Sequence, residues 1–111
     1  MRKLLVLAVT ALLAGALAAT ALAATKTVKV GDDWFVRPGK PTSVSVTKNT
    51  TVVWKWVGDK PHNVTVTKGP VKFRSTTKAS GTYRKKVTRA GTYTLVCTVH
   101  GSKQKMTLRV R

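Results

Sequence analysis

The segment AGTYTLVCTVH, Ala90 to His100, decides how this chain folds and what chemistry it can carry. Apolar and polar residues alternate after the turn signal Ala90-Gly91, and this period of two predicts a strand that ends at Cys97. Cys97 is the only cysteine of the chain, and His100, one of two histidines, follows it by three residues. A thiol and an imidazole are therefore placed together where a strand gives way to a loop.

The same alternation recurs along the rest of the chain. Valine, threonine and aromatic residues dominate these runs, and pairs such as Gly58-Asp59 and Gly69-Pro70 separate them at intervals of roughly 8–12 residues. This pattern predicts an all-β sandwich or barrel, without helical periodicity after the leader. The clearest runs are Val44–Val46, Val52–Trp56, Val64–Val66, Thr82–Thr88 and Lys105–Arg111.

The first 23 residues differ in composition from everything that follows. A positive start, Met1 to Lys3, precedes an apolar run from Leu4 to Ala19, and Ala21-Leu22-Ala23 is a small-x-small cleavage site. This order is typical of a secretory signal peptide that is removed on maturation, although a retained membrane anchor is the alternative. We expect a signal peptide at 1–23 and a single domain at 24–111, with no transmembrane helix after cleavage.

The charge balance is strongly basic. The chain has 21 Lys and Arg against three Asp and Glu, a net charge of +18, and loss of Arg2 and Lys3 with the leader leaves +16. Such a charge favours an acidic partner protein or an anionic surface of the cell envelope. We do not expect nucleic acid as a partner, because the chain is predicted to be exported, its cations are spread over many strands, and no nucleic-acid motif is present. We expect a monomer.

The single cysteine, Cys97, can have one of two roles in an exported protein. It cannot form an internal disulfide, so it is either a buried, inert thiol or a thiolate held by a metal. His62, after Pro61 at the start of a predicted strand, and His100 supply two imidazoles. One thiolate, two imidazoles and a weak axial donor make a trigonal blue-copper site. Zinc also accepts these donors, whereas a Cys-His protease would need an orienting third residue that is not found near Cys97.

With these residues in view, the sequence resembles the cupredoxins, the blue-copper family that includes plastocyanin, pseudoazurin and amicyanin. The likeness covers almost all of the chain after the leader, although Asn49 stands where glycine is usual. The first matching segment contains an aromatic-x-x-Pro step, Phe35 to Pro38, and the last is the G-x-Y-x-Y-x-C-x-x-H strand. The matching segments are DDWFVRPGKPTSVSV (32–46), KNTTVVWKW (48–56), KPHNVTV (60–66), KFRS (72–75) and AGTYTLVCTVH (90–100).

This resemblance implies a Greek-key β-sandwich or barrel of about seven to eight strands. It also implies that His62, Cys97 and His100 hold one type 1 copper ion, and that Asn63 ties the first ligand loop to the loop that bears the cysteine. The implied function is that of a small exported electron-transfer protein, periplasmic, in the cell envelope or extracellular, and not an enzyme. The edge of the His100 ring would be the exit for the electron.

The axial donor departs from the family pattern. Many relatives place a methionine three or five residues after the second histidine, and lysine occupies both positions here. In the amicyanin-like pattern the axial residue lies four positions before one aliphatic core residue and six positions before the next. Counting back four from Leu108 and six from Val110 leads to Gln104. We therefore expect Gln104 as the axial ligand, with Met106 as the alternative.

Two other functions are alternatives to electron transfer. One is a copper-binding module that buffers or delivers the metal with the same ligands. The other is a basic domain that binds the cell envelope through its charge, without a redox role. Reversible oxidation and reduction of bound copper separates electron transfer from both of these alternatives.

Overall fold

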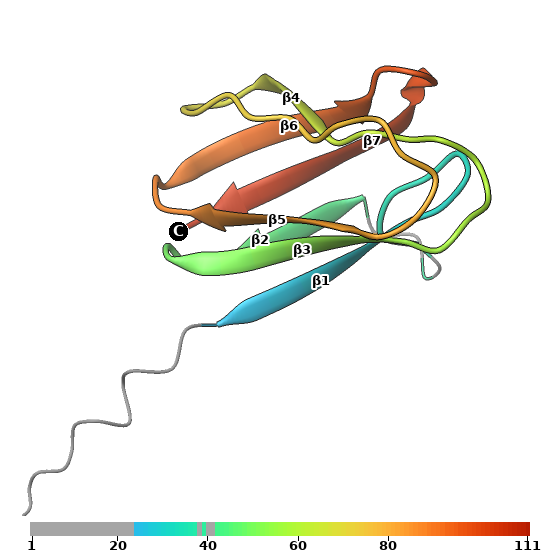
Figure 1. The fold of residues 1–111 in the computed structure, drawn as a ribbon. Helices are drawn as coiled ribbons and strands as arrows, with labels where there is room; N and C mark the ends of the chain where they lie inside the picture. Colours follow the sequence, from blue (N-terminus) through green and yellow to red (C-terminus); the bar gives the residue numbers. More distant parts are fainter. Residues whose placement is uncertain (1–23, 38, 40–41) are drawn as a thin grey trace, which may run out of the picture.

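The protein is a sandwich of two β-sheets (Figure 1), seen in a computed structural model that describes residues 24–37, 39 and 42–111. One sheet has three strands in the order β1-β3-β5 and the other has four in the order β2-β7-β6-β4. Seven strands in this part of the chain confirm the predicted all-β class. Their bounds are β1 Thr25–Val30, β2 Ser43–Val46, β3 Thr50–Trp56, β4 Thr65–Lys68, β5 Thr82–Val87, β6 Gly91–Cys97 and β7 Gly101–Val110.

Alternation along the strands places one set of side chains between the sheets. In β6, for example, Tyr93, Leu95 and Cys97 are buried, whereas the residues between them are more exposed. Successive side chains of a strand point to opposite faces of the sheet. The apolar residues that alternate in the sequence therefore form the inner face of each sheet. Trp54, Tyr93, Leu95 and Leu108 are among the largest fully buried side chains, and they fill the space between the sheets.

Neighbours in sequence often lie in different sheets. β1 pairs with β3 in parallel, β2 pairs with β7 in parallel, and the remaining pairs are antiparallel. The chain therefore crosses from one sheet to the other between β1 and β2 and again between β2 and β3. These crossings place β2 beside β7, the last strand, and the end of β6 lies beside the start of β7.

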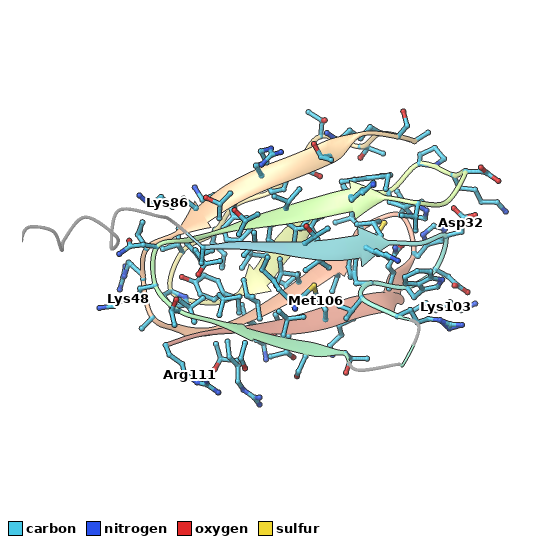
Figure 2. The ribbon with its side chains drawn as sticks, turned by 90° about the horizontal axis from the view of Figure 1, so that it is seen from below. Asp32, Lys48, Lys86, Lys103, Met106 and Arg111 are labelled. Carbon is cyan, nitrogen blue, oxygen red and sulfur yellow. The ribbon has the colours of Figure 1, made fainter. Side chains whose placement is uncertain are left out.

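The two ends of the sandwich differ in their loops (Figure 2). Asp32 and Lys103 lie at one end, whereas Lys48, Lys86 and Arg111 lie at the other. Cys97 and the turn that follows it belong to the first of these ends, which we call the ligand end. The described residues contain no helix long and apolar enough to span a bilayer. The predicted leader at 1–23 and the proline at position 38 lie outside the described residues, so predictions that involve them remain predictions.

Asn49 shows how the chain keeps a turn without the usual glycine. Its φ is 73°, in the left-handed region, and its amide donates to the carbonyl of Val87 over 2.7 Å. Asparagine enters this region more readily than other residues with a side chain, which explains why it replaces glycine before β3.

We expect Asn49→Ala to lower the free energy of unfolding by about 1 kcal/mol, because alanine tolerates positive φ poorly. Asn49→Gly is the matched control and should stay within about 0.5 kcal/mol of the parent, since glycine adopts this conformation without strain. Urea unfolding followed by tryptophan fluorescence measures both. Equal losses in the two variants would show that the Asn49 side chain, and not its backbone conformation, supports the turn.

Candidate metal centre

Three side chains from two separate connections converge at the ligand end. The Cys97 Sγ lies 3.9 Å from the His62 Nδ1 and 3.8 Å from the His100 Nδ1. The donor atoms of all three residues lie within 4.8 Å of one another. His62 comes from the connection between β3 and β4, and Cys97 and His100 bracket the turn between β6 and β7. The structure thus brings together the three residues that the sequence predicted.

The spacing of these donors suits one metal ion. A metal about 2.3 Å from sulfur and about 2.0 Å from nitrogen, with trigonal angles, holds the two donors about 3.7 Å apart. The two observed sulfur–nitrogen distances, 3.8 and 3.9 Å, are close to this value, and both rings turn the same nitrogen toward the thiol. One thiolate and two imidazoles suit copper in both oxidation states. The residues present therefore fit a type 1 copper ion.

Gln104 lies beside this cluster with its amide orientation fixed. Its Nε2 donates to the carbonyls of Gly31 over 2.8 Å and Trp34 over 3.0 Å. Because both amide hydrogens face carbonyl oxygens, the Oε1 must point the other way, and it lies 3.1 Å from the His100 Nδ1. An oxygen donor about 2.2 Å from a metal lies about 3.0 Å from a nitrogen ligand at a right angle to it.

Met106 lies in a different environment. It is fully buried, belongs to the hydrophobic core, and stands opposite Leu95 in the pairing of β6 with β7. Figure 2 shows Met106 between the sheets, and not at the end where Asp32 and Lys103 lie. Its burial is what a methionine with a packing role would show.

Asn63 joins the two ligand loops. Its Oδ1 accepts hydrogen bonds from the Thr98 amide over 3.1 Å and the Thr65 hydroxyl over 2.8 Å. Its Nδ2 donates to the hydroxyls of Thr98 over 2.8 Å and Thr77 over 3.0 Å. The residue that follows His62 is thereby bonded to the residue that follows Cys97. This is the arrangement that the family resemblance implied for Asn63.

Backbone hydrogen bonds hold the histidines in place. His62 and Lys78 exchange both amide–carbonyl bonds, at 2.9 and 3.0 Å, in an isolated bridge. The His100 amide donates to the Cys97 carbonyl over 3.2 Å, which closes the turn between the two ligands. The backbones of both histidines are therefore held by hydrogen bonds.

Asp32 is a contact of this site that the sequence analysis did not identify. Its Oδ1 lies 3.1 Å from the His62 Nε2 and accepts the amide hydrogens of Asp59 over 2.9 Å and Lys60 over 3.0 Å. The Lys60 amide, followed by the His62 side chain, lowers the pKa of the Asp32 carboxyl. A signal was present in the sequence: the chain has three acidic residues, and Asp32, Asp33 and Asp59 all belong to the two loops beside His62.

The rim of the site is partly apolar. His62 and Cys97 are fully buried, but His100 is partly exposed and its ring centroid lies 5.0 Å from that of His62. Val99 is 54% exposed and Val57 is 45% exposed, which makes them the large hydrophobic residues left open to solvent in the described part of the chain. Both lie in the connections that carry the ligands.

Comparison with known proteins agrees with this geometry. The family model described as copper binding proteins, plastocyanin/azurin family, matches residues 26–111. No curated protein matches the chain in sequence. Among solved structures, a methionine-to-glutamine variant of amicyanin in the Cu(I) form is similar with a TM-score of 0.65 and 23% identity, over 78% of this chain and 82% of that one.

Two further structures share the fold. The purple cupredoxin from Nitrosopumilus maritimus has a TM-score of 0.63 and 16% identity, over 78% of this chain and 99% of that one. The copper-containing nitrite reductase from Thermus scotoductus SA-01 has a TM-score of 0.63 and 23% identity, over 78% of this chain but 22% of that one. With the family model covering nearly all of the described residues, the chain belongs to the plastocyanin/azurin family of copper-binding proteins and is a cupredoxin.

Proposed function

We propose that this chain is a small exported electron carrier, in which His62, Cys97 and His100 hold one copper ion that alternates between Cu(II) and Cu(I). The observation that carries the proposal is the convergence of one sulfur and two Nδ1 atoms, with sulfur–nitrogen distances of 3.8 and 3.9 Å, inside a cupredoxin fold. Bound copper supplies the one-electron couple, and the side chains of this chain determine its geometry.

The burial of the site favours electron transfer over substrate chemistry. Cys97 and His62 have no exposed surface, so a substrate molecule cannot reach them, whereas an electron can pass through the partly exposed His100 ring. Asn63 keeps the two loops at a fixed separation, and a rigid donor set changes little between oxidation states. The chain thus acts as a carrier and not as an enzyme.

A redox partner would dock over His100. Val99, the residue before His100, is exposed and offers apolar contact beside the ring, and interface cores are enriched in apolar residues. Lys103 and Lys105 are exposed on the strand that leaves this end, and they would steer an acidic partner toward it. An anionic cell-envelope surface is the other binding partner that the net charge, +16 after loss of Arg2 and Lys3, would favour.

We also propose that Gln104, and not Met106, is the axial ligand. The Gln104 oxygen already faces the His100 Nδ1 at 3.1 Å, and two backbone carbonyls fix the amide in that orientation. Met106 packs in the core instead. An amide oxygen is a harder donor than a thioether and favours Cu(II), so this site should have a low reduction potential for the family.

Copper(II) added to the purified protein should give an intense absorption in the orange-red, from charge transfer between the Cys97 thiolate and the metal. The band should be absent from Cys97→Ser, because a hydroxyl does not supply this transition, and absent from the zinc-loaded parent, which serves as the control. Reversible bleaching by a reductant should accompany it. A colourless copper-loaded parent, or a band that survives in Cys97→Ser, would contradict the proposal.

Gln104→Met should raise the reduction potential and alter the copper spectrum, because a thioether stabilises Cu(I) relative to an amide oxygen. Met106→Leu is the matched control and should leave both nearly unchanged, since it exchanges core residues of similar volume. Voltammetry and visible spectroscopy measure the two variants side by side. The opposite pattern, with Met106→Leu perturbing the spectrum and Gln104→Met not, would identify Met106 as the ligand.

Oxidation of the reduced protein by an anionic reagent such as hexacyanoferrate(III) should slow as salt is added. The Debye length falls from about 10 Å at 0.1 M to about 3 Å at 1 M, so attraction between exposed charges is screened. The double variant Lys103→Glu with Lys105→Glu should be slower than the parent at low salt. Lys48→Glu with Lys86→Glu changes the net charge equally at the opposite end (Figure 2) and should slow the reaction less. Equal slowing would mean that net charge alone attracts the oxidant.

A further inference from the structure

The far side of the His62 ring is bonded to a carboxylate. The Nδ1 of this ring faces the Cys97 sulfur at 3.9 Å, and its Nε2 lies 3.1 Å from the Asp32 Oδ1. An ionised carboxylate only accepts hydrogen bonds, so the Nε2 must carry the hydrogen. In a neutral imidazole this leaves the free lone pair on Nδ1, the atom that faces the sulfur. The contact therefore selects the tautomer that can bind a metal at this position.

The Asp32 carboxylate is itself held firmly. Two backbone amides, those of Asp59 and Lys60, donate to the same Oδ1 that faces His62. Gly58 lies against this carboxylate, and a Cβ at that position would overlap the Asp32 side chain. The loop that leads to His62 therefore wraps around the carboxylate with a glycine at the point of closest approach. Such packing fits a fixed side chain better than a solvated one, although 40% of the Asp32 side chain is exposed.

The short loop that carries Asp32 reaches two donors of the site at once. Asp32 contacts His62, and the carbonyls of Gly31 and Trp34 accept from the Gln104 amide over 2.8 and 3.0 Å. The Gly31 amide closes this loop by donating to the Trp34 carbonyl over 2.8 Å. The segment from 31 to 34 thus supports the histidine from one side and the glutamine from the other.

We propose that Asp32 is a positioning residue of the metal centre, which fixes the metal-binding tautomer of His62 and, through its negative charge, favours Cu(II) over Cu(I). The inference rests on the proposed function, since it assigns Asp32 to the same copper site. A ligating histidine commonly donates its second ring N–H to a carboxylate, and loss of that partner typically reduces metal affinity by about 10–100-fold. Because Cu(II) has the higher charge, its affinity should fall more than that of Cu(I) when the Asp32 carboxylate is lost.

The competing role is purely structural, because Asp32 also binds the Asp59 and Lys60 amides. Asp32→Asn separates the two roles: it keeps an oxygen acceptor of the same size and removes the charge. Asp33→Asn is the matched control, since it removes the same charge from the adjacent position, and among the described residues Asp33 forms no hydrogen bond or ion pair with His62. Asp32→Ala removes both the acceptor and the charge.

The first measurement is the ratio of Cu(II) to Cu(I) affinity, obtained from the reduction potential of the copper-loaded protein. Asp32→Asn should lower this ratio about tenfold, which for a one-electron couple is a rise of about 59 mV. Asp33→Asn should change the ratio less than about twofold, as expected for an exposed charge that solvent and salt screen. Equal shifts in both variants, or an unchanged ratio in Asp32→Asn with reduced thermal stability, would overturn the proposal.

The second measurement needs no copper. Nitrogen NMR of His62 in the metal-free protein at neutral pH should show the Nε2–H tautomer in the parent and in Asp33→Asn, and loss of that preference in Asp32→Ala. A parent ring without the Nε2–H preference would overturn the assignment of Asp32. If the parent fails to cycle bound copper, the proposed function fails, and this NMR result still decides whether Asp32 sets the tautomer.

Discussion

The structure depends on a single constraint: the sulfur of Cys97 and two imidazole nitrogens, from two distant parts of the chain, must come together at one largely buried point. A buried polar group is costly unless it has a partner, and here the thiol and the His62 ring are fully buried. The sandwich satisfies this constraint at the place where β6 ends, because the β3–β4 connection and the β6–β7 turn approach each other there. The strands serve mainly to fix the separation of these two connections.

Polar contacts between the loops reinforce that separation. Asn63 uses its oxygen and its nitrogen on Thr98, and Asp32 and the backbone around it hold His62 and Gln104 from the opposite side. The ligands therefore lie between two supports, one formed by the β3–β4 connection itself and the other by the loop after β1. The His100 ring, which has fewer constraints and some exposure, is left as the contact with the outside.

Sequence reasoning identified the features that are local in the chain. The period of two predicted the strands and their inner faces, and the spacing Cys97-x-x-His100 placed two donors on one turn. Parity puts Gln104 and Met106 on the same side of the last strand, so the choice of Gln104 came from counting back from Leu108 and Val110. Alternation says which side of a strand is buried but not which strand lies next to it, so the parallel pairing of β1 with β3 could not be deduced. Asp32 lies 30 residues before His62, in a loop without periodicity, so no pattern in the sequence predicts their contact. The one hint was that the few acidic residues of the chain lie in the two loops beside His62.

The position of β7 in the four-stranded sheet links the metal site to the assembly of the whole sandwich. This last strand lies between β2 and β6, and it pairs Ser43 with Thr107 across more than half of the described chain. Pairings so distant in sequence slow folding, because closing a long loop costs conformational entropy before the contacts form. Asp32 and His62 precede β4, whereas Cys97 ends β6 and Gln104 lies within β7. Because these residues meet only when both sheets are assembled, the unfolded chain has no preformed site, and the free energy of metal binding adds to the stability of the fold.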